Sequence, residues 1–256
     1  MPEWLLMTLV MAGTCVVVVT GAFLNARRLG AGTDPDETPD VLDYMIMMIG
    51  VVYAIVLGLA IAGVWEARGA AQDGVRTEAQ ALHEVAERVS VYPRPVRDRV
   101  RGDVDAYVRH VVHTEWKVML DKGELTDRGA ELLTTLRRDV TLATPHSALQ
   151  AQAYQPMVDQ VAAVDEARGA RQQSAGPTMP HLVWFGLVLG AALVIGLVFT
   201  LQIRRSPREL MLAVMFTALI VFLLFLVWDF DEPFGRAVGD STTAFTDLFP
   251  SARGGS

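Results

Sequence analysis

Cysteine is almost missing from the sequence: Cys15 is the only one among 256 residues. A single cysteine excludes an intramolecular disulfide framework and any zinc site built from several cysteines. Charge is scarce as well, because Asp, Glu, Lys and Arg together make up 20% of the residues while 52% are hydrophobic. These proportions are typical of a membrane protein rather than of a water-soluble domain.

Basic residues are too few to balance the acidic ones, and the net charge is −7. A nucleic-acid partner would need a basic face that neutralises phosphates, so this balance argues against one. Enzyme signatures are missing too, since the sequence has no Gly-rich phosphate loop, no GxSxG and no HExxH. We therefore expect a protein that is not an enzyme.

Four long runs hold the hydrophobic residues, and none of them contains a charged residue. They cover residues 4–24, 44–65, 182–203 and 210–228. Each run is close to the roughly 20 residues that a helix needs to cross ~30 Å of hydrocarbon. The sequence therefore predicts an all-α integral membrane protein with two pairs of transmembrane helices, in residues 1–65 and 181–228.

A more polar insert, residues 66–180, separates the two pairs and shows helical periodicity. Apolar stripes run through four groups: Val75, Leu82, Val85 and Val89; Val96, Val100, Val104, Tyr107 and Val111; Leu132, Leu133, Leu136 and Val140; and Tyr154, Val158, Val161 and Asp165. The pair Thr144-Pro145 indicates a helix start. We expect a helical extramembrane domain here, and after the last span an acidic, largely irregular tail, residues 229–256.

Arginines in the short links predict the orientation in the membrane. Arg27 and Arg28 follow the first span, and Arg204, Arg205 and Arg208 lie between the third and fourth. By the positive-inside rule these links face the cytoplasm, so the insert and both termini are expected outside it. Arginines that flank the spans on the opposite side weigh against this orientation.

The best metal-like spacing in the insert is His110-x-x-His113, with Glu115 close by. Positions three apart share a face of a helix, so two imidazoles could reach one ion. The alternative is a pair of solvated histidines on a surface helix, because this face points away from the apolar stripe of the same helix.

A ridge of small residues follows one face of the second span. Gly50, Ala54, Gly58 and Ala62 recur every four residues, and Glu66 continues the series. Small residues allow two helices to approach closely, which favours simple helix packing. In a ring of subunits the same ridge would leave room for an ion pathway. A four-helix monomer without charged groups in its spans cannot enclose a hydrophilic route alone, so conduction would require such a ring.

Three carboxylates, Asp229, Asp231 and Glu232, come directly after the last span. Carboxylate oxygens are ligands that Ca²⁺ prefers, and a group of them also concentrates cations near a pore mouth. A third interpretation is a polar cap that ends the helix in water.

Several stretches resemble a known family of bacterial membrane proteins, described as bestrophin-like and of unknown function. They are IGVVYAIVLGLAIAGVWE in the second span, TEAQALHEV and VDAYVRHVVHTEW in the insert, and DFDEPF after the last span. The resemblance extends from about Val41 to Phe234. A weaker resemblance in layout links the chain to true bestrophins, which are homopentameric ion channels, mostly anion-selective and gated by calcium.

Carried over by position, the true bestrophins imply a pore neck at the Gly50 to Ala62 ridge and a calcium site at Asp229, Asp231 and Glu232. The chain departs from them because it lacks their bulky neck and their long acidic run. The leading hypothesis is a homo-oligomeric ion channel of the bacterial cell membrane, with membrane lipid and small ions as its partners and selectivity left open. The alternative is a non-conducting membrane scaffold or stress-sensing module whose insert binds a partner.

Overall fold

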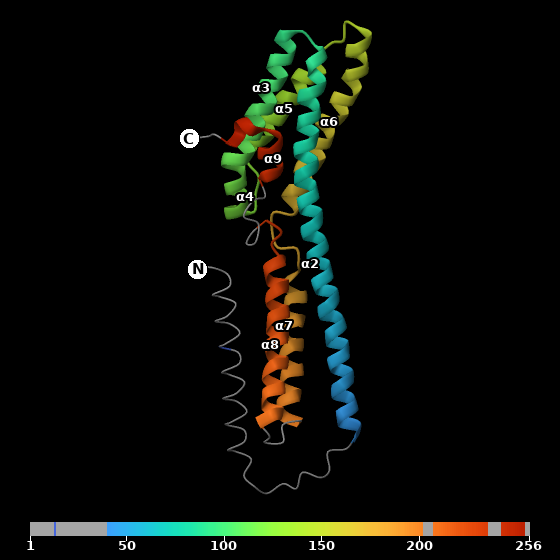
Figure 1. The fold of residues 1–256 in the computed structure, drawn as a ribbon, viewed down its shortest axis with the longest axis vertical. Helices are drawn as coiled ribbons and strands as arrows, with labels where there is room; N and C mark the ends of the chain where they lie inside the picture. The colour runs from blue at the N-terminus through green and yellow to red at the C-terminus, as the bar shows by residue number, and fades with distance from the viewer. Residues whose placement is uncertain (1–12, 14–39, 202–206, 235–241, 254–256) are drawn as a thin grey trace. The chain divides into compact units, whose positions relative to one another are not determined.

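The computed structural model describes residue 13 and residues 40–201, 207–234 and 242–253 (Figure 1). In these residues every regular element is helical, which confirms the all-α prediction. Three of their helices are long and apolar enough to cross a membrane. The expected first span, residues 4–24, lies outside the described residues except for Gly13.

Three helices cover the other expected spans, and the regular elements between the second and third spans are helical as well. In chain order the helices are α2 (Asp40–Arg88), the 3-10 helix η1 (Val89–Val91), α3 (Arg94–His110), the π-helix η2 (Val111–Glu115), α4 (Trp116–Lys122), α5 (Asp127–Thr141), α6 (Ala148–Gln173), α7 (His181–Leu201), α8 (Pro207–Phe230), α9 (Thr243–Leu248) and the 3-10 helix η3 (Pro250–Arg253).

The chain divides into two compact units. We call Met1–Trp65 with Met179–Asp231 the apolar unit, and Glu66–Thr178 with Glu232–Ser256 the polar unit. The limits expected from the sequence fall after residues 65, 180 and 228, and those of the structure fall after 65, 178 and 231. Helix α2 is continuous from Asp40 to Arg88 and contributes residues to both units.

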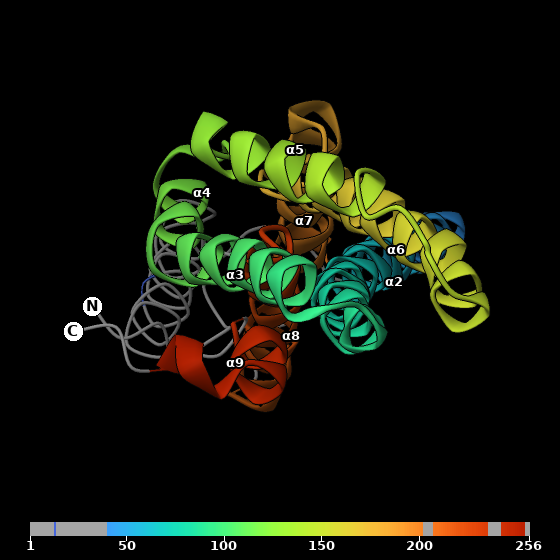
Figure 2. The same ribbon diagram turned by 90° about the horizontal axis from the view of Figure 1, so that it is seen from above.

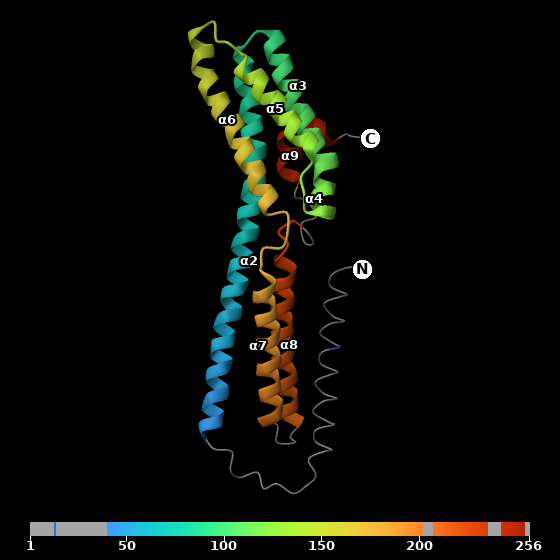
Figure 3. The same cartoon turned by 180° about the vertical axis from the view of Figure 1, so that it is seen from behind.

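In the apolar unit, α7 and α8 lie side by side (Figures 1 and 3). The buried core comprises Tyr53, Leu57, Ala60 and Val64 of α2, Leu187, Ala191 and Val194 of α7, and Ile220 and Val227 of α8. Large apolar side chains on the other faces are exposed, among them Met48, Leu59 and Phe185. Such a surface suits contact with lipid or with further protein rather than with water.

In the polar unit, α3 lies between α5 and the C-terminal α9 (Figure 2). The predicted stripes of the first two helices are buried here, including Leu82 and Val85 of α2 and Val104 and Tyr107 of α3, except for Val96, which is half-buried. The described part of the C-terminal tail also joins this core. It forms α9 and η3, and Phe245, Phe249 and Ala252 are buried, so the expectation of a largely irregular tail is wrong for these residues.

Two details of α6 differ from the prediction. The helix begins at Ala148 rather than at Thr144-Pro145, because the Ser147 side chain accepts a hydrogen bond from the Gln150 amide (3.2 Å) and so caps the helix. Its buried face comprises Met157, Val161, Val164, Ala167 and Arg171. Of the predicted stripe, only Val161 is buried, and Asp165 is exposed.

Candidate functional site

The small-residue ridge of α2 is open along most of its length. Gly50 is half-buried, and Ala54, Gly58, Ala62 and Glu66 are exposed. A Cβ atom added to Gly50 or Gly58 would meet no described atom within 4 Å. Among the described residues, none therefore packs against the ridge at Gly50 or Gly58.

Helix α2 packs in the protomer through a different face. The ring of Tyr53 lies against Gly190 of α7, where an added Cβ would come within 2.7 Å of two ring carbons. The Tyr53 hydroxyl donates a hydrogen bond to the Leu187 carbonyl oxygen (3.1 Å). The close approach of α2 and α7 thus uses a glycine of α7, and the glycines of the α2 ridge stay free for other contacts.

The three carboxylates after the last span differ in their surroundings and hydrogen bonds. Asp231 accepts hydrogen bonds from the Met179 amide (2.7 Å) and from Trp184 Nε1 (2.9 Å), so it ties the start of α7 to the end of α8. Glu232 belongs to the polar unit, where it lines a cavity of about 220 Å³ together with Lys122 and Phe234. Asp229 is half-buried.

No three side chains of His, Cys, Asp or Glu form a group able to hold a metal ion in the part of the chain that the structure describes. This statement also covers the pair His110 and His113 with Glu115. His113 is exposed, as the solvated alternative predicts, but His110 is half-buried and its Nε2 lies 2.7 Å from Thr126 Oγ1. The calcium site at Asp229, Asp231 and Glu232 stays a prediction.

A buried charge network in the polar unit was missed by the sequence analysis. Arg171 of α6 and Glu78 of α2 are fully buried and form two hydrogen bonds, Nε to Oε2 (2.8 Å) and Nη2 to Oε1 (3.1 Å). The Tyr107 hydroxyl donates to Glu78 Oε1 (2.7 Å). Arg171 Nη2 also donates to Oε1 of Glu115 (2.8 Å), so one guanidinium joins α2, α6 and η2.

The network continues from Glu115 toward the surface. Glu115 Oε2 accepts hydrogen bonds from Arg168 Nη2 (2.8 Å), the Thr126 amide (3.1 Å) and the Thr126 hydroxyl (2.7 Å). Because the Thr126 hydroxyl donates to Glu115, it accepts from His110, whose Nε2 therefore carries a proton. Two arginines and two glutamates balance each other, which makes their burial tolerable.

The electrostatic environment keeps these groups in their expected charge states. Burial, then the charge of Glu78, raises the pKa of Tyr107 well above its ordinary value, so the phenol stays a donor. Burial acts to raise the pKa of Glu115, but Arg171, Thr126 and Arg168 outweigh it and hold this pKa below its usual value. Burial lowers the pKa of His110, although Glu115 opposes the change.

The sequence does contain a signal for this network. Glu78 lies three residues after Val75 and four before Leu82, and Arg171 lies four residues after Ala167. Glu78 is thus in register with the predicted apolar stripe of α2, where a solvated side chain cannot lie, whereas Arg171 is in register with Val164 and Ala167, which the predicted stripe of α6 did not include. Glu115 is the last residue of a π-helical turn, which occurs frequently at functional positions and which no simple 3.6-residue period predicts.

The fold and its exposed apolar surface define an all-α membrane protein with a second, more polar helical unit. The model of the Bestrophin-like domain matches residues 12–245, so the chain belongs to the Bestrophin-like family. No curated protein matches the chain.

Two similar solved structures are of a bacterial bestrophin homologue from Klebsiella pneumoniae. The one obtained by Zn-SAD phasing has a TM-score of 0.68 and 12% sequence identity, and covers 98% of this chain and 99% of that chain. A single-residue variant of the homologue gives a TM-score of 0.69 at 13% identity over 98% and 99% of the two chains. At this identity the likeness establishes a shared fold.

Proposed function

We propose that the protein is a homo-oligomeric ion channel in which the α2 ridge, Gly50, Ala54, Gly58, Ala62 and Glu66, lines the pathway. The observation that supports this most strongly is the open ridge: small residues recur on one face, and no described atom covers the added Cβ positions at Gly50 and Gly58. Packing inside the protomer uses Gly190 instead.

In a ring of subunits, such a ridge would line a central pathway. The spans contain no charged residue, so one protomer offers no hydrophilic route of its own. Several copies of α2 around an axis would place small side chains at the narrowest part and leave room for a partly hydrated ion. Membership of the Bestrophin-like family agrees with this arrangement, and the resemblance to true bestrophins suggests five subunits.

Charge near the ridge favours cations. Glu66 is exposed and extends the ridge, so a ring of subunits would gather one carboxylate from each copy.

We place the protein in the bacterial cell membrane with four spans, with the insert and both termini outside the cytoplasm. Calcium binding at Asp229, Asp231 and Glu232 is part of the proposal, and there Asp231 would exchange two existing hydrogen bonds for a metal ion. Equal flux with calcium and with a calcium chelator would count against that part.

Ion flux from liposomes containing the purified protein tests the proposal. The variant Gly58→Leu is expected to reduce the flux at least tenfold, because it narrows the pathway. Gly63→Leu is the matched control: an added Cβ at Gly63 also meets no described atom, and five residues turn the helix by about 140° away from Gly58. A wild-type protein without flux, or equal effects of the two variants, would contradict the proposed pathway.

Two further measurements determine the ion selectivity and the number of subunits. Under a KCl gradient we expect the reversal potential to approach the potassium equilibrium value, and Glu66→Gln to move it toward zero. Native mass spectrometry is expected to show more than two subunits. A monomer or dimer without flux would instead support the non-conducting scaffold, because two copies supply too few helices for a central pore.

A further inference from the structure

Helices α3 and α5 pack against each other in the polar unit (Figure 2). Two aspartates, one from each helix, lie at this contact. Asp103 of α3 is half-buried and lies next to the fully buried Val104. Asp139 of α5 precedes the fully buried Val140, and its side chain is only 11% exposed. Both carboxyl groups therefore lie at the edge of the hydrophobic core, where ionisation is costly.

If both carboxyl groups are ionised, they present more hydrogen-bond acceptors than the surrounding residues supply donors. Oδ2 of Asp103 is buried and receives no donor from any described residue. Arg99 lies one turn before Asp103 on the same face of α3 and reaches Asp139, so the Asp103 carboxyl group lies beside that of Asp139. Two carboxylates are acceptors only, so a hydrogen bond between them requires one proton.

Charged neighbours stabilise Asp139 more directly than Asp103. Arg138 of α5 has its Nε 3.4 Å from Asp139 Oδ1, and Arg99 of α3 has its Nε 4.0 Å from Asp139 Oδ2. These arginines and Asp139 are the charged groups that act on Asp103. Burial, followed by the charge of Asp139 and the hydrogen bond with it, raises the pKa of Asp103 to about 6, although Arg138 and Arg99 oppose the shift. The proton thus belongs on Asp103.

We propose that Asp103 and Asp139 form a proton-operated contact, in which one shared proton joins α3 to α5 in mildly acidic solution and its loss at neutral pH loosens the two helices. This device is separate from the ion pathway and holds whether or not the protein conducts ions. The sign follows from linkage: the folded protein binds the Asp103 proton more tightly than the unfolded chain does. The contribution to stability is therefore full below the ordinary pKa of 3.8 and is lost as the pH rises from there through about 6.

Hydrogen exchange of the full-length protein in nanodiscs, at pH 5 and pH 7.5 and corrected for intrinsic rates, tests the contact. We expect peptides of α3 and α5 to be about tenfold less protected at pH 7.5, because pH 5 lies about one unit below the Asp103 pKa of about 6. Asp103→Asn mimics the protonated group and should keep these peptides protected at both values. Asp139→Asn should also abolish the pH dependence, because its amide can donate to an ionised Asp103.

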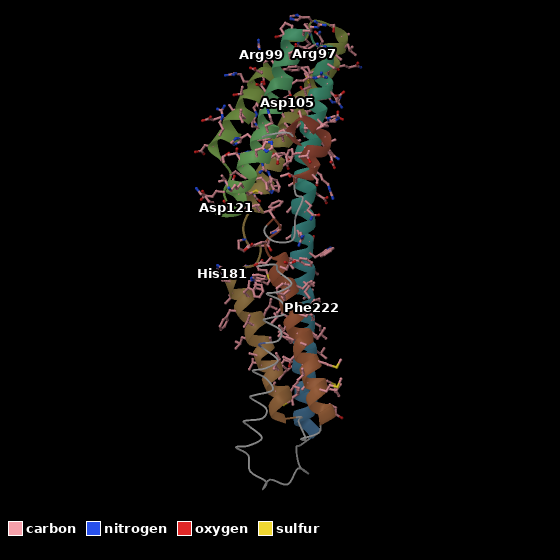
Figure 4. All side chains as sticks on the ribbon, turned by 60° about the vertical axis from the view of Figure 1, so that its left-hand side comes forward. Arg97, Arg99, Asp105, Asp121, His181 and Phe222 are labelled. Carbon is pink, nitrogen blue, oxygen red and sulfur yellow. The ribbon has the colours of Figure 1, made fainter. Side chains whose placement is uncertain are left out.

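The matched control is Asp105→Asn, two residues further along α3, which should keep the wild-type pH dependence (Figure 4). Equal protection of wild-type α3 and α5 at the two pH values would overturn the proposal. So would a pH dependence that survives in both Asp103→Asn and Asp139→Asn, since a pair that shares no proton predicts that result.

Discussion

Glu115 is stable as a buried carboxylate because four hydrogen bonds reach it, from Arg171, from Arg168 and from the amide and hydroxyl of Thr126. The carboxylate fits only because the facing residue of α5, Gly129, has no side chain. A Cβ atom at Gly129 would collide with Glu115 Oε2 and lie 2.8 Å from Arg168 Nη2. This glycine is required by close approach and not by its backbone conformation.

Replacing Gly129 or Gly102 by alanine should therefore change the free energy of unfolding in opposite directions. Gly129→Ala pushes the carboxylate away from its donors and is expected to lower the free energy of unfolding by about 1–3 kcal/mol. Gly102→Ala, in α3, meets no described atom and is expected to raise it by up to about 1 kcal/mol. Thermal unfolding of the full-length protein in detergent measures both. Similar shifts in the melting temperature would show that Gly129 does not make room for Glu115.

Loss of the central cation should be more severe. Arg171→Met leaves Glu78 and Glu115 buried without their main partner, which costs about 3–5 kcal/mol. In a protein of this size, the melting temperature should fall by roughly 10 °C. The exposed pair Arg128 and Glu131 supplies the control, because Arg128→Met should leave the melting temperature nearly unchanged. If Arg171→Met melts like wild type, the network does not stabilise the polar unit.

At the scale of elements, α2 approaches α7 closely where the Tyr53 ring lies against Gly190. Gly190→Ala places a methyl group against the Tyr53 ring and strains its hydrogen bond to Leu187, so we expect a loss of about 1–3 kcal/mol. Gly186→Ala on the same helix meets no described atom and should be neutral or slightly stabilising. Melting curves of both variants test the contact. If Gly190→Ala has no effect on the melting temperature, the Tyr53 ring does not pack tightly against Gly190.

Long apolar runs and clean helical stripes could be predicted from the sequence. The span at 44–65 lies within α2, and Val100, Val104 and Tyr107 are buried as expected. Hydrophobicity alone could not place the buried face of α6, where Arg171 replaces an apolar residue and the charge is neutralised by α2 and η2, distant in sequence. Contacts between distant segments, such as Asp103 with Asp139, leave no periodic signal.

The candidate site, like the fold, could be predicted from the sequence only in part. The four-residue repeat of small residues from Gly50 to Ala62 is visible in the sequence, but the sequence could not distinguish packing within the protomer from packing outside it. The open space around Gly50 and Gly58, and the use of Gly190 by Tyr53, favour an external role. The hydrogen bonds of Asp231 to Met179 and Trp184 were equally hidden, because they depend on where α7 begins.

At the scale of the whole molecule, the proposal requires copies of α2 to surround one axis. A four-residue repeat drifts by about 40° per step around a helix, so the ridge winds slowly and each neighbour would follow it at a tilt. The exposed apolar residues on the remaining faces of α2, α7 and α8 are then divided between lipid and adjacent subunits. The assembly, rather than the protomer, would be the functional unit.

The most direct test of this central claim is the access of a charged thiol reagent to α2 while current is recorded in planar bilayers. In a Cys15→Ala background, Ala54→Cys is expected to lose most of its current on addition of the reagent. Val56→Cys, two residues away and on nearly the opposite side of the helix, should keep its current. Block of Val56→Cys with no effect on Ala54→Cys would contradict a pathway lined by the Gly50 to Ala62 ridge.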